Sequence, residues 1–212
     1  MKKTILKMIA VAGIVTGSVL STNAQIAIGL TGGLGLPMGD MSDKTKMGAD
    51  LGFGGGITAR YFLTEKLAVG LNASYFSFGV KDLPSGASAS IGVMPISVAF
   101  DYYLMTEGLK PFLGLEAGIV NNSPKASGTI SGINFESSAS KTGLLVAPVV
   151  GIAYGLTDEF DISLNAKYMF GMTDGKIDFK STANGTTQNL SQDWFNTTYI
   201  GINLGISYKL GN

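Results

Sequence analysis

The alternation in residues 200–210, which read IGINLGISYKL, decides the fold. Every second residue from Ile200 to Leu210 is apolar, and the residues between them are glycine, asparagine, serine and lysine. A period of two is that of a β-strand, whose successive side chains point to opposite faces. The stretch therefore predicts a strand with one apolar and one polar face.

The same alternation recurs along the chain. The eight strands predicted in this way cover residues 26–36, 51–63, 67–76, 93–102, 112–119, 144–154, 160–170 and 200–210. Stretch 144–154 is apolar on both faces, so its pattern defines its register least well. No stretch after residue 24 approaches the 18 consecutive apolar residues typical of a membrane-spanning helix, whereas tilted strands of about 10 residues are long enough to cross a bilayer.

Charged residues avoid the apolar faces of these strands. Of the 27 charged residues after residue 24, six lie inside the predicted strands, all on the Gly/Ser/Asn face: Arg60, Asp101, Glu116, Asp161, Lys167 and Lys209. An Arg or Lys facing lipid at the bilayer midplane costs roughly 2–4 kcal/mol. The pattern predicts a barrel with an apolar exterior in lipid and a polar interior. A soluble exported barrel of the lipocalin type is the alternative, and it would carry its charges outside.

The connections alternate between short and long. Residues 64–66, 105–108 and 156–159 form the short ones, and residues 37–50, 80–90, 121–142 and 171–198 form the long ones. Short periplasmic turns and long extracellular loops are typical of outer-membrane barrels. Because an open strand edge in hydrocarbon would leave backbone groups unpaired, the first and last strands must meet. We predict an all-β, eight-stranded antiparallel up-and-down transmembrane barrel.

The N-terminus has the pattern of a secretory signal peptide. Lys2, Lys3 and Lys7 precede an apolar run from Met8 to Leu20, and small residues lead to a cleavage site after Ala24. We therefore divide the chain into a cleaved signal peptide, 1–24, and one barrel domain, 25–212. The domain has 188 residues with 12 basic and 15 acidic side chains, which gives no basic surface for nucleic acid.

These features together resemble a known family. The signal peptide, eight alternating stretches, three tight turns and four long loops are similar to the small outer-membrane β-barrel proteins of the OmpA/OmpX transmembrane-domain type, over residues 25–212. The resemblance lies in architecture rather than in a sequence motif. It implies a bacterial outer-membrane location, ion pairs that fill the barrel, and, for the OmpX type, a projecting strand edge that pairs with external proteins.

The composition argues against several classes of enzyme. The chain has no cysteine and no histidine, so thiol catalysis, Ser-His-Asp catalysis and the usual zinc and haem ligands are excluded. We expect no catalytic residues, no metal and no cofactor. A lipid-modifying barrel enzyme is disfavoured because the versions known in similar proteins depend on a histidine.

Two groups of residues are candidates for function. Because an eight-stranded barrel is just wide enough to be filled by side chains, we expect ion pairs in the lumen among Arg60, Asp101, Glu116 and Lys167. Packing is favoured over a gate, a proton path or an acid pair for hydrolysis. In the third and fourth long loops, the apolar residues expected to form interaction surfaces are Ile133, Phe135, Ile177, Phe179, Trp194 and Phe195.

The first functional hypothesis is a non-enzymatic barrel with a surface-structural or adhesive role. Its expected partners are outer-membrane lipid and, through projecting hairpins, extracellular proteins or a host surface; within the membrane we expect a monomer. Loops that merely pack on one another and cover the barrel mouth are the simpler alternative. The second hypothesis is a narrow conduit for small or apolar solutes.

Overall fold

The structure is a computed structural model that describes residues 25–130, 132–183 and 185–210. The predicted signal peptide, residues 1–24, lies outside the described residues. Among the described residues, no helix has the length and hydrophobicity needed to span a bilayer.

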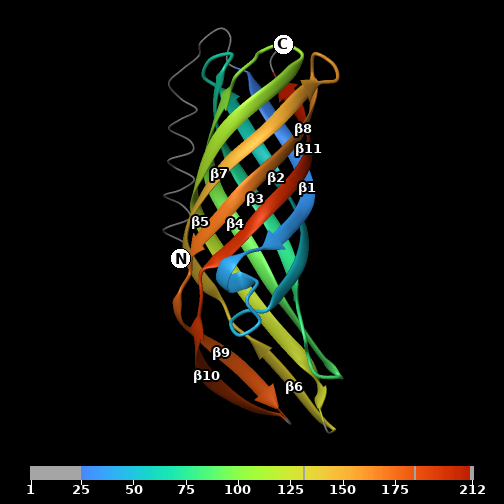
Figure 1. The fold of residues 1–212 in the computed structure, drawn as a ribbon, viewed down its shortest axis with the longest axis vertical. Coiled ribbons are helices and arrows are strands. Elements are labelled where there is room, and N and C mark those ends of the chain that lie inside the picture. The colour runs from blue at the N-terminus through green and yellow to red at the C-terminus, as the bar shows by residue number, and fades with distance from the viewer. Residues whose placement is uncertain (1–24, 131, 184, 211–212) are drawn as a thin grey trace.

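Eight antiparallel strands form a closed barrel (Figure 1). They are β1 (Ile26–Pro37), β2 (Ala49–Phe62), β3 (Leu67–Val80), β4 (Ala87–Tyr103), β5 (Leu109–Ile130), β7 (Lys141–Gly155), β8 (Phe160–Met172) and β11 (Thr197–Leu210). Twelve residue pairs join β1 to β11, from Ile26 opposite Leu210 to Pro37 opposite Tyr199. The β5–β7 ladder completes the ring. The predicted fold class and all eight strands are confirmed.

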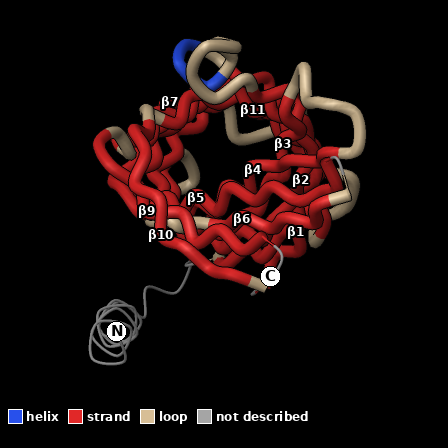
Figure 2. The backbone as a smooth tube through the Cα atoms, turned by 90° about the horizontal axis from the view of Figure 1, so that it is seen from below, coloured by secondary structure: helices blue, strands red, loops and turns tan. Residues whose placement is uncertain are grey.

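Three further strands lie beyond the barrel, at its lower end in Figure 1. They are β6 (Ile133–Ser138), β9 (Gly175–Ala183) and β10 (Thr186–Trp194). Strand β5 has 22 residues, and its last part pairs with β6, which pairs with β9, which pairs with β10. We call this four-stranded arrangement, from the end of β5 to β10, the extracellular sheet. It lies over one side of the barrel mouth when viewed along the barrel (Figure 2).

The apolar face of every barrel strand points outward. Leu204 is 57% exposed and Leu144 is 62% exposed, and large aliphatic and aromatic residues on the other strands are exposed in the same way. In β7, where both faces are apolar, Leu145 is only 1% exposed and therefore faces inward. The outer surface is thus a continuous apolar belt suited to lipid.

Not all of the aromatic residues near the long loops lie in this belt. Aromatic residues at the level of a membrane interface are typical of the outer surface of a barrel, and Tyr75, Tyr168, Phe76, Phe78 and Tyr199 all lie beside the long loops. Tyr75 and Tyr168 do face outward, but Phe76, Phe78 and Tyr199 are buried inside the barrel. All three are at alternate positions of their strands whose side chains face inward, so they fill the lumen instead.

Candidate functional site

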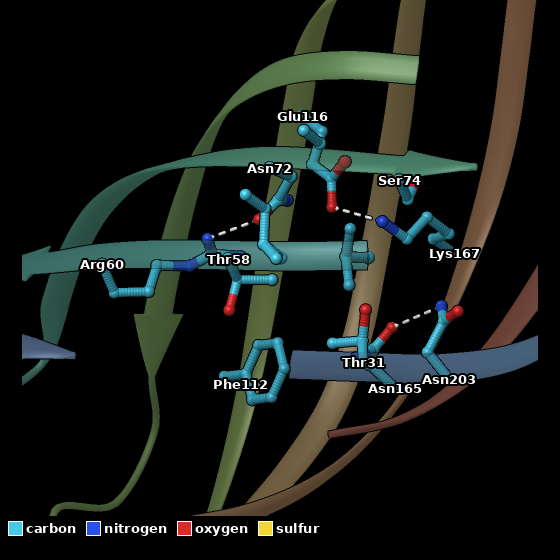
Figure 3. Close-up of a pocket in the computed structure, with 13 residues that line it drawn as sticks. Thr31, Thr58, Arg60, Asn72, Ser74, Phe112, Glu116, Asn165, Lys167 and Asn203 are labelled. Atoms are coloured by element: carbon cyan, nitrogen blue, oxygen red, sulfur yellow. Dashed lines mark hydrogen bonds and ion pairs between the residues drawn. The ribbon is translucent and has the colours of Figure 1, made fainter. Parts of the chain in front are cut away.

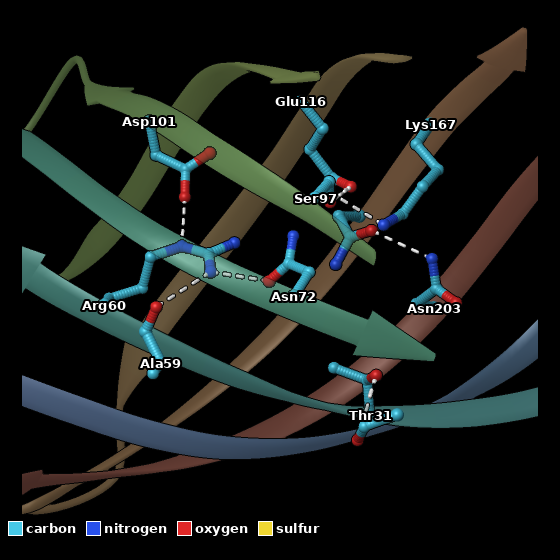
Figure 4. Close-up of polar contacts among 11 residues, drawn as sticks. Thr31, Ala59, Arg60, Asn72, Ser97, Asp101, Glu116, Lys167 and Asn203 are labelled. Carbon is cyan, nitrogen blue, oxygen red and sulfur yellow. Dashed lines mark hydrogen bonds and ion pairs between the residues drawn. The ribbon is translucent and has the colours of Figure 1, made fainter. Parts of the chain in front are cut away.

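The lumen contains two ion pairs formed by the four predicted residues. Arg60 on β2 reaches across β3 to Asp101 on β4, with Nε 2.5 Å from Oδ2 (Figure 4). This crossing is possible because Gly70 stands opposite Arg60 on β3; a Cβ at Gly70 would lie 2.6 Å from the Arg60 Cδ. Arg60 Nη1 also donates to the Asn72 side chain, at 2.6 Å.

The second pair joins β8 to β5 across β7. Lys167 Nζ lies 2.8 Å from Glu116 Oε1, and the Ser97 hydroxyl donates to Glu116 Oε2 at 2.9 Å. Ala147, opposite Glu116 on β7, is small and fully buried, which leaves room for the lysine to pass. Each carboxylate is therefore matched by one cation, as buried charges require.

A third ionic cluster was not among the predicted ion pairs, although Asp161 and Lys209 were predicted to lie on the polar face of their strands. Asp161 on β8 lies 3.0 Å from Lys110 Nζ and 3.2 Å from Lys209 Nζ, close to the end of the barrel with the short turns. Lys110 precedes the stretch 112–119 that we assigned to a strand. Lys110 lies on the same face of the strand as Phe112 and Glu116, so extending the alternation by two residues would have placed it in the lumen.

Between these charges lies a small cavity of about 40 Å³ (Figure 3). Its polar walls include Thr31, Thr58, Asn165 and Asn203, and Arg60, Glu116 and Lys167 also line it. A buried water needs roughly 10–15 Å³ of cavity volume, so the cavity has room for a few waters and none for a larger solute. The rest of the inner lumen is filled by side chains.

The outer half of the lumen is closed by apolar side chains. The Tyr199 ring packs against Phe76 and Phe78, with ring centres 5.5 and 5.1 Å apart. Space for Phe78 comes from Gly35 and Gly52, because a Cβ at either position would lie within 2.6 Å of its ring. We call the whole cluster the apolar plug; its buried members are Met41, Met47, Ala49, Phe76, Phe78, Ile91, Val93, Val120, Leu145, Met169, Ile177, Trp194 and Tyr199.

The first long connection contributes Met41 and Met47 to this plug. It contains a short 3-10 helix, η1 (Gly39–Met41), and is held by polar contacts on its outer side. The Thr45 hydroxyl and backbone N–H both donate to Asp43, which lowers the pKa of that carboxyl. Lys46 pairs with Asp40, which raises the pKa of the lysine, and its Nζ lies 5.2 Å from the centre of the Phe195 ring.

The six apolar loop residues predicted as interaction surfaces fall into two groups. Ile133 is 45% exposed at the tip of the extracellular sheet, and Phe135, Phe179 and Phe195 are partly buried. Ile177 and Trp194, by contrast, are buried in the apolar plug, so the exposure expected for them is wrong. They face inward because the β9–β10 hairpin begins and ends over the barrel mouth, where burying apolar area is favourable.

The fold is shared with solved outer-membrane proteins. A major outer membrane protein from Thermus thermophilus is similar with a TM-score of 0.64 and 11% identity, over 88% of this chain and 99% of that chain. OprG from Pseudomonas aeruginosa has a TM-score of 0.55 and 19% identity, over 89% and 96% of the two chains. The outer membrane protease OmpT from Escherichia coli has a TM-score of 0.54 and 9% identity, over 91% and 99%.

At these identities the similarity establishes the fold. Neither protein-family models nor curated protein sequences match the chain. The molecule has the architecture of an outer-membrane β-barrel, and its outer apolar belt is suited to lipid.

Proposed function

We propose that the chain is a non-enzymatic outer-membrane protein that acts at the cell surface through its extracellular sheet. The observation that carries the proposal is the continuation of β5 beyond the barrel into a sheet with β6, β9 and β10. A barrel that served only to fill the membrane would not need this ordered extension. Strand edges held in such a sheet are able to bind other proteins through their backbone groups.

A conduit has less support. The apolar plug fills the outer half of the lumen, and the ion pairs and the small cavity occupy the inner half. An acid-pair hydrolase is also disfavoured, because each of the two carboxylates is held in an ion pair, Asp101 by Arg60 and Glu116 by Lys167.

The test is a surface-binding assay with a shortened extracellular sheet. Residues 129–134 and 179–190 are each replaced by a short Gly/Ser turn, which keeps Ile177 and Trp194 in the plug. Cells that carry this variant, inserted normally as judged by heat-modifiable gel migration, are expected to lose their adherence to other cells and surfaces. Unchanged adherence would refute the proposal. Conductance of the intact chain above background in planar bilayers would favour the conduit instead.

A further inference from the structure

Strand β10 is an open edge of the extracellular sheet. It ends the strand order, and eight of its nine residues are exposed. Proteins usually protect such edges with proline, lysine or a bulge. β10 has no proline, lysine or bulge, and its one charged residue is Asp193 near its end: its sequence is TTQNLSQDW, and its pairing with β9 runs without a shift from Thr186 to Trp194. The edge is therefore available for pairing.

The pairing with β9 determines which backbone groups are free. The hairpin closes on Ala183 opposite Thr186, which in a two-residue connection form a hydrogen-bonded pair. Along an antiparallel ladder, hydrogen-bonded pairs alternate with non-hydrogen-bonded pairs, and the side chains of a non-hydrogen-bonded pair lie closer together. The next pair, Thr182 and Thr187, is of the non-hydrogen-bonded kind, and its hydroxyls are 2.9 Å apart. The N–H and C=O groups of Thr187, Asn189, Ser191 and Asp193 therefore point away from β9.

We propose that β10 pairs antiparallel with β10 of a second copy of this chain, held in a facing membrane. This inference rests on the proposed surface function and names the partner. In the register centred on Leu190, Thr187 pairs with Asp193 of the second copy, and Asn189 pairs with its Ser191. The free N–H and C=O groups of all four residues then bond to the same groups of the second copy. A register centred on residue 189 or 191 would leave one of the four residues without a strand residue opposite it.

The side chains also favour a second copy. Leu190, 45% exposed, stands opposite Phe179 on β9 and shares its face. At the centre of the pairing, Leu190 would lie opposite Leu190 of the second copy. Together with Phe179 on β9 of each copy, the two leucines would form an apolar row across four strands. Cross-strand apolar pairs of this kind stabilise sheets by roughly 0.2–1 kcal/mol each.

Charge does not oppose the pairing. The hairpin carries two lysines, Lys176 and Lys180, and two aspartates, Asp178 and Asp193, so it is neutral. Asp193 stands opposite Lys176 within its own hairpin and would face the uncharged Thr187 of the second copy. Like charges are not brought directly opposite one another, which would be destabilising.

The symmetry of the pairing determines where the second copy lies. Two adjacent antiparallel strands of identical sequence are related by a two-fold axis perpendicular to their sheet. One strand, β5, runs out of the barrel wall into the extracellular sheet, so this axis is perpendicular to the outer part of β5 and the rotation reverses the direction of that strand. The rotation therefore reverses the barrel, and the two copies point in opposite directions. Such copies belong to two facing membranes, while each remains a monomer in its own.

Single cysteines test the register, because the chain has no native cysteine. Leu190→Cys would stand opposite itself, at a spacing that allows a disulfide, whereas two Gln188→Cys residues would lie about 14 Å apart along the strands. Two populations of proteoliposomes, carrying barrels of different mass, are mixed under mild oxidation. We expect L190C to give about tenfold more disulfide-linked dimer between populations than Q188C. Equal yields from both, or no dimer, would overturn the inference.

A second variant tests the edge itself. Asn189→Pro removes one free N–H and leaves the bonds to β9 intact, since Asn189 does not donate to β9. Vesicle clustering by the intact chain, measured by light scattering, is expected to fall to background with N189P but to persist with Thr58→Ser, a change inside the barrel. Clustering that survives N189P would overturn the inference. If vesicles carrying the intact chain do not cluster but shortening the sheet still abolishes adherence of cells, the proposed function stands and the second-copy pairing is wrong.

Discussion

Removing Lys167 should destabilise the barrel far more than removing an exposed lysine. In Lys167→Met, Glu116 loses its cation while its side chain remains 4% exposed. Leaving one buried partner uncompensated costs about 3–5 kcal/mol. The Ser97 hydroxyl still donates to Glu116, so we expect a loss near the lower end of that range, about 3 kcal/mol.

A double-mutant cycle isolates the interaction. In Glu116→Gln/Lys167→Met neither charge of the pair remains, so the loss should fall to about 1 kcal/mol, well below the sum of the two single losses. Lys44→Met is the matched control, because the Lys44–Asp82 pair has side chains 68% and 66% exposed. Exposed pairs contribute roughly 0–1 kcal/mol.

Urea unfolding in phospholipid vesicles measures these differences. Trp194 is the only tryptophan and is buried in the apolar plug, so its fluorescence reports unfolding. A Lys167→Met loss below about 1 kcal/mol, or single losses that simply add in the double variant, would refute the account of the lumen.

Three further predictions concern other parts of the barrel. Gly33→Ala should cost about 1–3 kcal/mol of unfolding free energy, because the new Cβ would lie 2.2 Å from the Ile202 carbonyl oxygen. Gly32→Ala is the control and should be nearly neutral, because its new Cβ would have its nearest neighbour at 3.9 Å. Equal effects of the two substitutions in urea unfolding would contradict this prediction. Leu204→Lys, on the lipid-facing belt, should cost about 2–4 kcal/mol in the same assay, and an unchanged midpoint would mean that this face does not meet lipid. Phe78→Ala should cost about 3–5 kcal/mol by leaving a cavity in the apolar plug, and a loss under about 1 kcal/mol would show that the plug is loosely packed.

The alternation in the sequence is sufficient to predict the barrel and the faces of its strands. It does so because lipid and a narrow lumen impose opposite polarity on neighbouring residues, as with Leu204 and Asn203. Strand ends are less well predicted: β5 continues to Ile130, whereas the pattern indicated 112–119. Beyond the membrane the outward face meets water instead of lipid, so polar residues such as Lys125 and Ser127 take the exposed positions and the apolar alternation is lost.

The apolar plug is the part that the sequence predicts least well. Phe76 and Phe78 share the inward parity of Asn72, but aromatic residues near a membrane interface are equally typical of the outer surface. Burial of Trp194 and Ile177 depends on how a long connection docks on the barrel, and local pattern carries no information about that. Pairing of charges in the lumen depends on the small residues Gly70 and Ala147, which are recognised only when the strand register is known.

The length of β5 has a mechanical consequence. One continuous strand runs from the inner end of the barrel, at Leu109, to the tip of the extracellular sheet. A force that pulls on the sheet is therefore transmitted along β5. It loads the hydrogen bonds between β5 and its neighbours β4 and β7 in shear, so these bonds resist together instead of breaking one after another. A tether attached at this point is anchored by the whole wall of the barrel.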